Sequence, residues 1–331
     1  MMTFRTEIGL PKVGKQLNYR DKSLMIGSCF TENMGNYLQK HYFPVLTNPC
    51  GILYNPASMA TCIEMLLTGK RITENELFFA NELWNNFHFH SRFSNPDKET
   101  ALASMNDSLE AASKQLRLAS HLFLTFGTSW VFVEKMNNTI VGNCHKLPAD
   151  RFTRRRLTVD EMAAQWIGII DKLLVINPGI SVILTISPIR HMKDGSYENQ
   201  ISKSGLFLLV DRLLGHFGPK NLTYFPSFEL VMDELRDYRF YAADMLHLSE
   251  TATAFVQEKF NGVFLDSESK EINFALDKII KSLDHKPFHA NNPVYQDMLS
   301  RLLEEVKKIV SKYPEIDLND LIINIVQKKE L

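Results

Sequence analysis

Three residues of this chain have the types and spacing needed for nucleophilic catalysis. Ser28 follows Gly27 at the end of the short apolar segment 23–26, and Asp244 lies three residues before His247. A serine hydroxyl is a weak nucleophile at neutral pH, so it needs a base and donors for the developing oxyanion. A histidine can act as that base, and a nearby carboxylate can hold its imidazole in the correct tautomer. The pattern predicts acyl chemistry with Ser28 as nucleophile, His247 as base and Asp244 as orienting carboxylate.

Structural roles for the same residues stay open at this point. Ser28 could cap the helix that follows, although Thr31 could do so equally well. Cys29 is a competing thiol, but buried free cysteines usually serve as small packing residues. Asp244 could cap a helix while His247 is simply buried.

The elements that must position these residues alternate between strands and helices. Apolar strands are predicted at 23–26, 43–47, 122–126, 181–186 and 222–225. Helical patterns are predicted at 33–41, 55–68, 97–119, 158–177 and 201–217. This alternation favours a mainly parallel sheet with crossover helices. Ser28 would then lie at the carboxyl edge of the sheet, where open α/β folds bind their ligands.

The rest of the chain divides into an insertion, a hairpin and a tail. Segment 71–95 is rich in aromatic residues and is predicted to lie over the sheet edge, while 131–142 is a predicted hairpin. The tail is predicted to form helices at 271–283, 294–309 and 318–326. The predicted organisation is one α/β domain over 1–265, followed by a helical extension over 266–331.

Composition excludes several classes of function. The chain has 331 residues and a formal charge of −1, which argues against nucleic acid or an anionic membrane surface as partner. Its four cysteines are too scattered for a disulfide scaffold or a zinc knuckle. No apolar run suits a signal peptide or a membrane span, so a cytoplasmic location is expected. No cofactor or metal is expected, because His88, His90 and His145 lack a further ligand at a characteristic spacing.

The two site segments together carry a family resemblance. Gly27-Ser28-Cys29-Phe30, with Asp244-x-x-His247 much later, resembles the GSCFA family of the SGNH/GDSL hydrolase superfamily. The resemblance spans roughly 1–265 and also includes segments 48–56, 143–146 and 237–241. It implies a three-layer α/β/α sandwich with a central five-stranded sheet. It also implies ester hydrolysis by a Ser-His-Asp triad without a cofactor.

The resemblance further implies three donors in the oxyanion hole. They would be the amide of Ser28, the amide of Gly51 and an Asn side chain after the third strand. At that third position the chain has Gly-Thr-Ser-Trp over 127–130, without an Asn. Asn143 from the adjacent hairpin is the predicted replacement, with Ser129 or Thr128 as alternatives.

Further polar residues are predicted near the carboxyl edge of the sheet or in the aromatic insertion. The candidates for substrate contact are His90, Ser129, His145, His191, Glu229 and Arg239. Each could instead be a satisfied structural residue. The arginine run 154–156 is expected to be a solvated face before a helix. The aromatic residues of 78–93 are expected to pack in a core, with a sugar-stacking platform as the alternative.

The predicted function is a serine esterase acting on a small or carbohydrate-linked O-acyl ester. The same triad would transfer the acyl group if the pocket admitted an alcohol and excluded water. A non-catalytic ligand-binding protein is the third possibility, because of the missing Asn. The sequence leaves the oligomeric state open.

Overall fold

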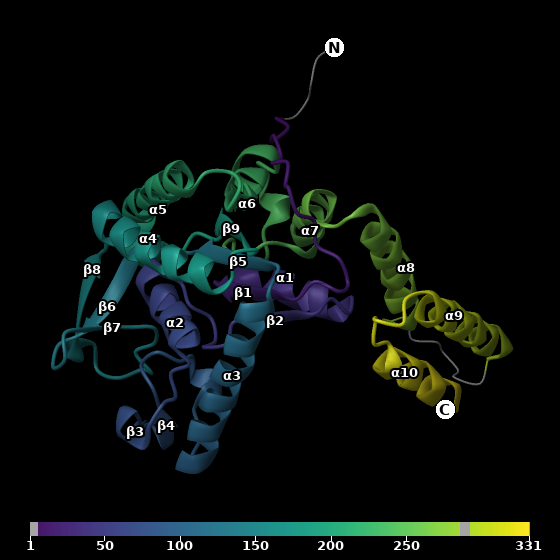
Figure 1. Ribbon diagram of the computed structural model, residues 1–331, viewed down its shortest axis with the longest axis horizontal. Coiled ribbons are helices and arrows are strands. Elements are labelled where there is room, and N and C mark those ends of the chain that lie inside the picture. Colours follow the sequence, from purple (N-terminus) through teal and green to yellow (C-terminus); the bar gives the residue numbers. More distant parts are fainter. Residues whose placement is uncertain (1–5, 285–291, 331) are drawn as a thin grey trace.

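A five-stranded parallel sheet forms the centre of the computed structural model, which describes residues 6–284 and 292–330 (Figure 1). The strand order is β10-β9-β5-β1-β2, and every neighbouring pair is parallel. The strands are β1 (Ser23–Gly27), β2 (Val45–Thr47), β5 (His121–Phe126), β9 (Ser181–Ile186) and β10 (Leu222–Tyr224). All five predicted strands are confirmed, as is the α/β/α fold class.

Alternate residues of the strands point into two separate apolar cores, one on each face of the sheet. On β1, Leu24 and Ile26 enter one core while Met25 enters the other. The first core includes α2 (Pro56–Thr68), α3 (Lys98–Leu118), α4 (Val159–Ile176) and α5 (Gly195–Phe217). The second includes α1 (Cys29–Lys40), α7 (Glu250–Phe264), α8 (Ser267–Asp284), α9 (Pro293–Lys312) and α10 (Asn319–Glu330). Helices therefore cover both faces of the sheet, which makes three layers.

Side-chain caps explain where several predicted helices begin. The Asn55 side chain accepts a hydrogen bond from the Ser58 amide at the start of α2, where Pro56 is the first helical residue. Thr158 and Glu161 form a capping box at the start of α4. Helix α1 begins at Cys29, earlier than predicted, because the turn after β1 leads into it directly.

A three-stranded antiparallel sheet lies outside the central one. Strands β6 (Trp130–Glu134) and β7 (Thr139–Val141) form the predicted hairpin. Strand β8 (Phe152–Arg156) pairs with β6 on the other side, so the arginine run belongs to a strand that the sequence did not reveal. The aromatic insertion contains a second hairpin of β3 (Phe78–Ala80) and β4 (Leu83–Asn85).

The three carboxyl-terminal helices are confirmed, and they lie together at one end of the molecule (Figure 1). Helix α8 contacts α1 through polar side chains: Asn273 donates to the Tyr37 hydroxyl at 2.8 Å, and Lys40 pairs with Asp284. A domain boundary at 265/266 stays a prediction. Within the described residues, no helix has the length and apolar character needed to cross a membrane.

Candidate active site

The turn between β1 and α1 holds Ser28 in a buried position. Ser28 is the N-cap residue of α1, yet its side chain makes no capping hydrogen bond. The hydroxyl is completely buried and has no hydrogen-bond partner within the described residues. A buried hydroxyl without a partner costs free energy, so the fold gains nothing from this group.

Gly27 is required by the tight geometry of this turn. Its φ of +155° is rare for residues with a side chain, and a Cβ there would lie 2.5 Å from the Thr125 carbonyl oxygen. Its amide donates to Asn48 Oδ1 at 2.8 Å. The Asn48 amide group in turn donates to Glu32 at 3.0 Å, and Glu32 pairs with Arg92. The turn of Gly27 and Ser28 is therefore connected to α1 and to the aromatic insertion.

Gly51 lies beside this network, where its amide is already engaged. The Gly51 N–H donates to the Asn48 carbonyl oxygen at 2.8 Å. Gly51 has a φ of +81°, and an added Cβ would lie 2.1 Å from the Cβ of His90. Close packing against His90 thus explains the glycine without an oxyanion role, and that role stays a prediction.

The loop before α7 holds Asp244 and His247 as a pair. Asp244 Oδ2 lies 2.5 Å from His247 Nδ1, and Asp244 Oδ1 accepts from the His247 and Leu246 amides at 2.9 Å. The hydrogen bond from His247 lowers the pKa of Asp244 to about 2, so this carboxylate is ionised at neutral pH. Both side chains are about half exposed, at 48% for His247 and 47% for Asp244. This arrangement engages Nδ1 and leaves Nε2 for another partner.

No hydrogen bond joins Ser28 Oγ to the His247 ring within the described residues. The two segments still face the same edge of the sheet, as their electrostatic neighbours show. His191 has its pKa lowered by burial first, and then by the positive charges of Lys203 and His247. Lys203 also interacts electrostatically with Cys29, the residue after Ser28. His191 therefore lies within electrostatic range of both Lys203 and His247, and Lys203 lies within range of Cys29.

Lys203 is a completely buried cation that sequence reasoning missed. It lies on α5, and its Nζ donates to the Ser187 carbonyl oxygen at 2.6 Å. Burial is the main cause that lowers its pKa to about 7, with Arg190 adding to the effect. Burial likewise raises the pKa of the Cys29 thiol, which therefore stays protonated at neutral pH. Cys29 consequently lacks the thiolate character of a catalytic cysteine.

A cavity of about 530 Å³, here called the aromatic cavity, opens at this edge. Its lining combines aromatic and polar residues from the three-stranded sheet, the insertion and the segment after β9. They are Ile52, Tyr54, Asn55, His90, Thr128, Trp130, Phe132, Val141, Gly142, Asn143, Cys144, Leu147, Ala149, Phe152, Arg154, His191, Lys193 and Asp194. Two of the predicted contact residues, His90 and His191, meet here with Asn143, the predicted oxyanion donor.

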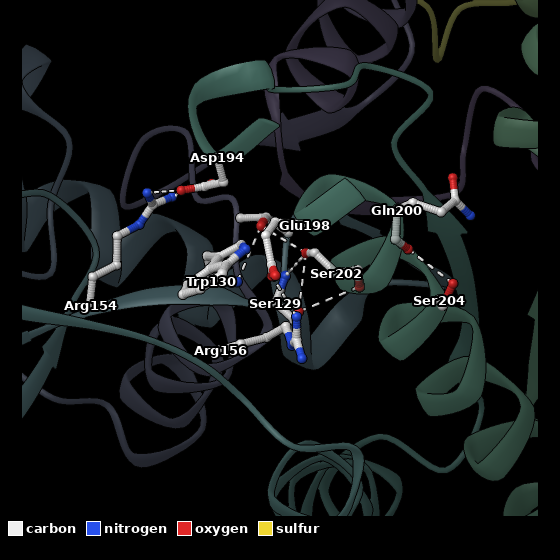
Figure 2. A network of polar contacts seen from close by, with 10 residues as sticks. Ser129, Trp130, Arg154, Arg156, Asp194, Glu198, Gln200, Ser202 and Ser204 are labelled. Carbon is white, nitrogen blue, oxygen red and sulfur yellow. Dashed lines mark hydrogen bonds and ion pairs between the residues drawn. The ribbon is translucent and has the colours of Figure 1, made fainter. Parts of the chain in front are cut away.

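The wall of the aromatic cavity is fixed by bonds to α5 and to the segment that precedes it (Figure 2). Arg154 on β8 forms a bidentate ion pair with Asp194 and lies 5.0 Å from the Trp130 ring. The Ser129 amide donates to the Ser202 hydroxyl at 2.8 Å. These bonds hold β6 and β8 against α5, so Trp130 and Phe132 present a rigid aromatic surface.

Comparison with family models identifies the family. The model of the GSCFA family matches residues 22–260, which include both the turn of Ser28 and the loop of Asp244 and His247. The chain belongs to the GSCFA family. A second model, for the carboxyl-terminal domain of GSCFA domain proteins, matches residues 276–328. A comparison with curated proteins finds no match.

Two solved structures are similar to this GSCFA chain, both at low sequence identity. One, from Streptococcus pneumonia, is of a protein proposed to be a platelet activating factor. It is 13% identical, with 73% of this chain and 83% of that chain covered and a TM-score of 0.35. The other is an acetyl xylan esterase from the rumen bacterium Butyrivibrio proteoclasticus. It is 14% identical, with 63% and 56% covered and a TM-score of 0.30.

Four predicted contact residues of this GSCFA chain lie outside the lining of the aromatic cavity. Ser129 is buried, and its hydroxyl bonds to Ser202. His145 is buried, with Nε2 2.8 Å from the Asn86 carbonyl oxygen. Glu229 accepts from the Tyr224 hydroxyl at 2.8 Å, and burial raises its pKa. The Arg239 side chain is 74% exposed and pairs with Asp237. A contact between substrate and any of these four residues stays a prediction.

No group of His, Cys, Asp and Glu side chains within the described residues has a geometry suited to a metal ion. The sequence alternative built on three histidines is also unsupported by their positions. His145 bonds to a carbonyl oxygen, and His90 Nδ1 accepts from the Arg92 amide at 3.2 Å.

Proposed function

We propose that this protein is a serine-dependent ester hydrolase with Ser28 as nucleophile. The observation that carries the proposal is the Ser28 hydroxyl itself. It lies at the carboxyl end of a central strand, at the N-cap of a helix, and makes neither a capping bond nor any other described hydrogen bond. This hydroxyl is held by no structural bond within the described residues and lies where open α/β folds place their reacting groups, so it is available for chemistry.

In this mechanism Ser28 Oγ attacks the acyl carbonyl while His247 Nε2 takes its proton. Asp244 holds the other ring nitrogen through the 2.5 Å contact and stabilises the imidazolium that forms. His247 then returns the proton to the leaving alcohol, and an acyl-serine remains. Water attacks this acyl group with His247 again as base, and the acid and free Ser28 are released.

The loop from Asp244 to His247, here called the base loop, must approach Ser28 for this chemistry. Asp244 and His247 are joined by several local bonds, so the loop can move without breaking the pair. Catalytic hydrogen bonds often tighten only when substrate is bound. The Ser28 amide is the first oxyanion donor, and Asn143 in the wall of the aromatic cavity is a candidate for another. Gly51 could contribute only if its amide turned away from Asn48.

The aromatic cavity suits the alcohol half of a small or carbohydrate-linked ester. Trp130 and Phe132 offer flat apolar surfaces, and the histidines and Asn143 offer hydrogen bonds. A panel of acetyl, butyryl and sugar O-acetyl esters tests the proposal through acid release by the native protein and Ser28→Ala. We expect turnover of at least one ester in the native protein alone. Equal turnover in both proteins would contradict the mechanism.

Acyl transfer is the second candidate, because a further cavity of about 480 Å³ lies on the other side of segment 190–193. Arg190 and Met192 line that cavity, whereas His191 and Lys193 line the aromatic cavity. Two adjoining cavities could hold an acyl donor and an alcohol acceptor. Product analysis with and without free sugar acceptors separates the two functions, since transfer yields an acylated sugar in place of free acid.

A further inference from the structure

The second cavity, here called the arginine cavity, borders the base loop. Its lining consists of Arg190, Met192, Met232, Arg236, Asp237, Tyr238, Tyr241, Met245 and Leu246. Met245 and Leu246 are the two residues between Asp244 and His247, so a molecule in this cavity would touch the loop that carries the proposed base. The cavity combines an apolar wall of methionine and tyrosine with two arginines.

The two arginines of this cavity differ from almost all others in the protein. Among the arginines of residues 6–284 and 292–330, only three are outside ion-pair distance of a carboxylate: Arg117, Arg190 and Arg236. Arg117 donates to the Leu67 carbonyl oxygen near the end of α2. The two remaining arginines share one cavity, in a chain whose formal charge is only −1.

The partners of Arg190 leave its charge uncompensated. One Nη donates to Gln200 Oε1 at 2.8 Å, and the guanidinium lies 5.7 Å from the Phe228 ring. Its Nε is buried without a hydrogen-bond partner in the part of the chain that the structure describes. A buried guanidinium N–H without an acceptor is costly, and within the described residues no carboxylate balances the charge of Arg190 at the cavity.

The carboxylate in the same cavity belongs to a different pair. Asp237 lies 3.6 Å from Arg239 Nε and also accepts from the Arg239 amide at 3.0 Å. The charge of Arg190 also reaches the buried Lys203, where it adds to the effect of burial in lowering the pKa. The lining of the arginine cavity therefore holds two arginines and one carboxylate that is already paired with Arg239.

We propose that the arginine cavity is a subsite for an anionic group, a carboxylate or phosphate, carried by the ester substrate. A guanidinium fork matches the oxygens of either group, and the methionine and tyrosine wall suits an apolar segment between that group and the ester. This inference rests on the proposed ester hydrolysis for its kinetic consequences. The binding of an anion to the cavity does not depend on turnover.

Matched ester pairs test the kinetic consequence. In the first pair, mono-4-nitrophenyl succinate is the anionic ester and 4-nitrophenyl butyrate is the neutral one. In the second pair, 4-acetoxybenzoate is the anionic ester and methyl 4-acetoxybenzoate is the neutral one. 4-Acetoxyphenyl phosphate distinguishes phosphate from carboxylate. In at least one pair we expect the native protein to favour the anionic ester by about tenfold in kcat/KM, mainly through KM. The double variant Arg190→Gln/Arg236→Gln should remove that preference and keep turnover of the neutral esters within about twofold.

The matched control is Arg212→Gln, which removes an exposed arginine of α5 that pairs with Asp160. It should keep the preference for the anionic ester. Equal or better turnover of the neutral ester in both pairs would overturn the inference while leaving ester hydrolysis intact. A preference that survives in the double variant would overturn it as well.

Calorimetric titration of Ser28→Ala separates this inference from the proposed function. We expect 4-acetoxybenzoate or 4-acetoxyphenyl phosphate to bind at least about tenfold more tightly than methyl 4-acetoxybenzoate, and the difference to vanish when Arg190→Gln and Arg236→Gln are added. This outcome without any turnover in the native protein would refute the esterase and keep the anion site. Binding that ignores charge would refute the anion site.

Discussion

The turn that holds Ser28 and the loop that holds Asp244 and His247 differ in how they are fixed in the structure. Ser28 is fully buried in a turn that Gly27 and Asn48 connect to the sheet and to α1. Asp244 and His247 are about half exposed, and their side chains bond chiefly to each other and to their own loop. The comparison teaches that the core of the protein fixes the position of Ser28, whereas Asp244 and His247 are held mainly by bonds within their own exposed loop. Substitutions in the two regions should therefore separate stability from activity.

The largest effect is expected from Ser28→Ala. Loss of the nucleophile should lower kcat by at least about 10³-fold, because neither the oxyanion donors nor binding can replace it. The same change removes a buried hydroxyl that has no described partner, so the thermal midpoint should be equal to or higher than that of the native protein. Acid release and a thermal melt on the same sample provide the check. A large loss of stability would mean that the hydroxyl has a structural role.

Asp244→Asn should reduce kcat by about 10²- to 10⁴-fold with little change in stability. The amide cannot hold the imidazole in the same tautomer or stabilise its positive charge. Because the loop is exposed, its contribution to the unfolding free energy is small. The measurement compares kcat with the midpoint of chemical denaturation. Unchanged kcat would show that the Asp–His pair is only a surface contact.

Gly27→Ala should instead act on folding. The new Cβ would lie 2.5 Å from a backbone oxygen at a φ of +155°, so the turn must distort, at a cost of about 2–4 kcal/mol in unfolding free energy. Gly215→Ala is the matched control, because no atom lies within 4 Å of its added Cβ. That control should be neutral or slightly stabilising. Equal effects at the two positions would contradict the tight turn described here.

Lys203→Met should change how stability depends on pH. Lysine in the unfolded chain titrates near 10.4, whereas burial lowers the pKa of Lys203 to about 7 in the folded protein. Between these values the unfolded state binds a proton that the folded state does not, so native stability rises with pH through this group. Relative to Lys203→Met, the native protein should gain about 1 kcal/mol per pH unit from pH 7.5 to 9.5.

Chemical denaturation at those two pH values measures this difference. Lys172→Met removes an exposed lysine that pairs with Glu64, and it serves as the control because it should leave the slope unchanged. Parallel stability profiles for the native protein and Lys203→Met would show that Lys203 keeps an ordinary affinity for protons despite its burial.

Much of the fold was predictable because it rests on local patterns. The five apolar strands and the capped helices α2, α3 and α4 need only short-range signals, and all were predicted. Strand β8 was not predicted, because its arginines lack the apolar alternation of a half-buried strand. They are accommodated by ion pairs with residues far along the chain, such as Asp194 and Glu198.

Local sequence patterns predicted less of the candidate site than of the fold. Gly27-Ser28 and Asp244-x-x-His247 are recognisable as short motifs, so sequence reasoning could name them. Lys203 looks like an ordinary polar residue in a helical pattern, and only tertiary packing buries it completely. Arg190 and Arg236 can be recognised as arginines without a carboxylate partner only when the partners of the other described arginines are known. Such features depend on which charges are left uncompensated, and a sequence does not reveal this.

Covalent labelling with a fluorophosphonate tests the central claim most directly. The probe reacts with serines that an adjacent base has activated, and peptide mass spectrometry locates the adduct. We predict an adduct on Ser28 in the native protein and none there in Ser28→Ala or His247→Ala. An adduct on Ser28 that persists unchanged in His247→Ala would contradict the proposed base. The absence of any Ser28 adduct in a protein that hydrolyses short esters would contradict Ser28 as nucleophile.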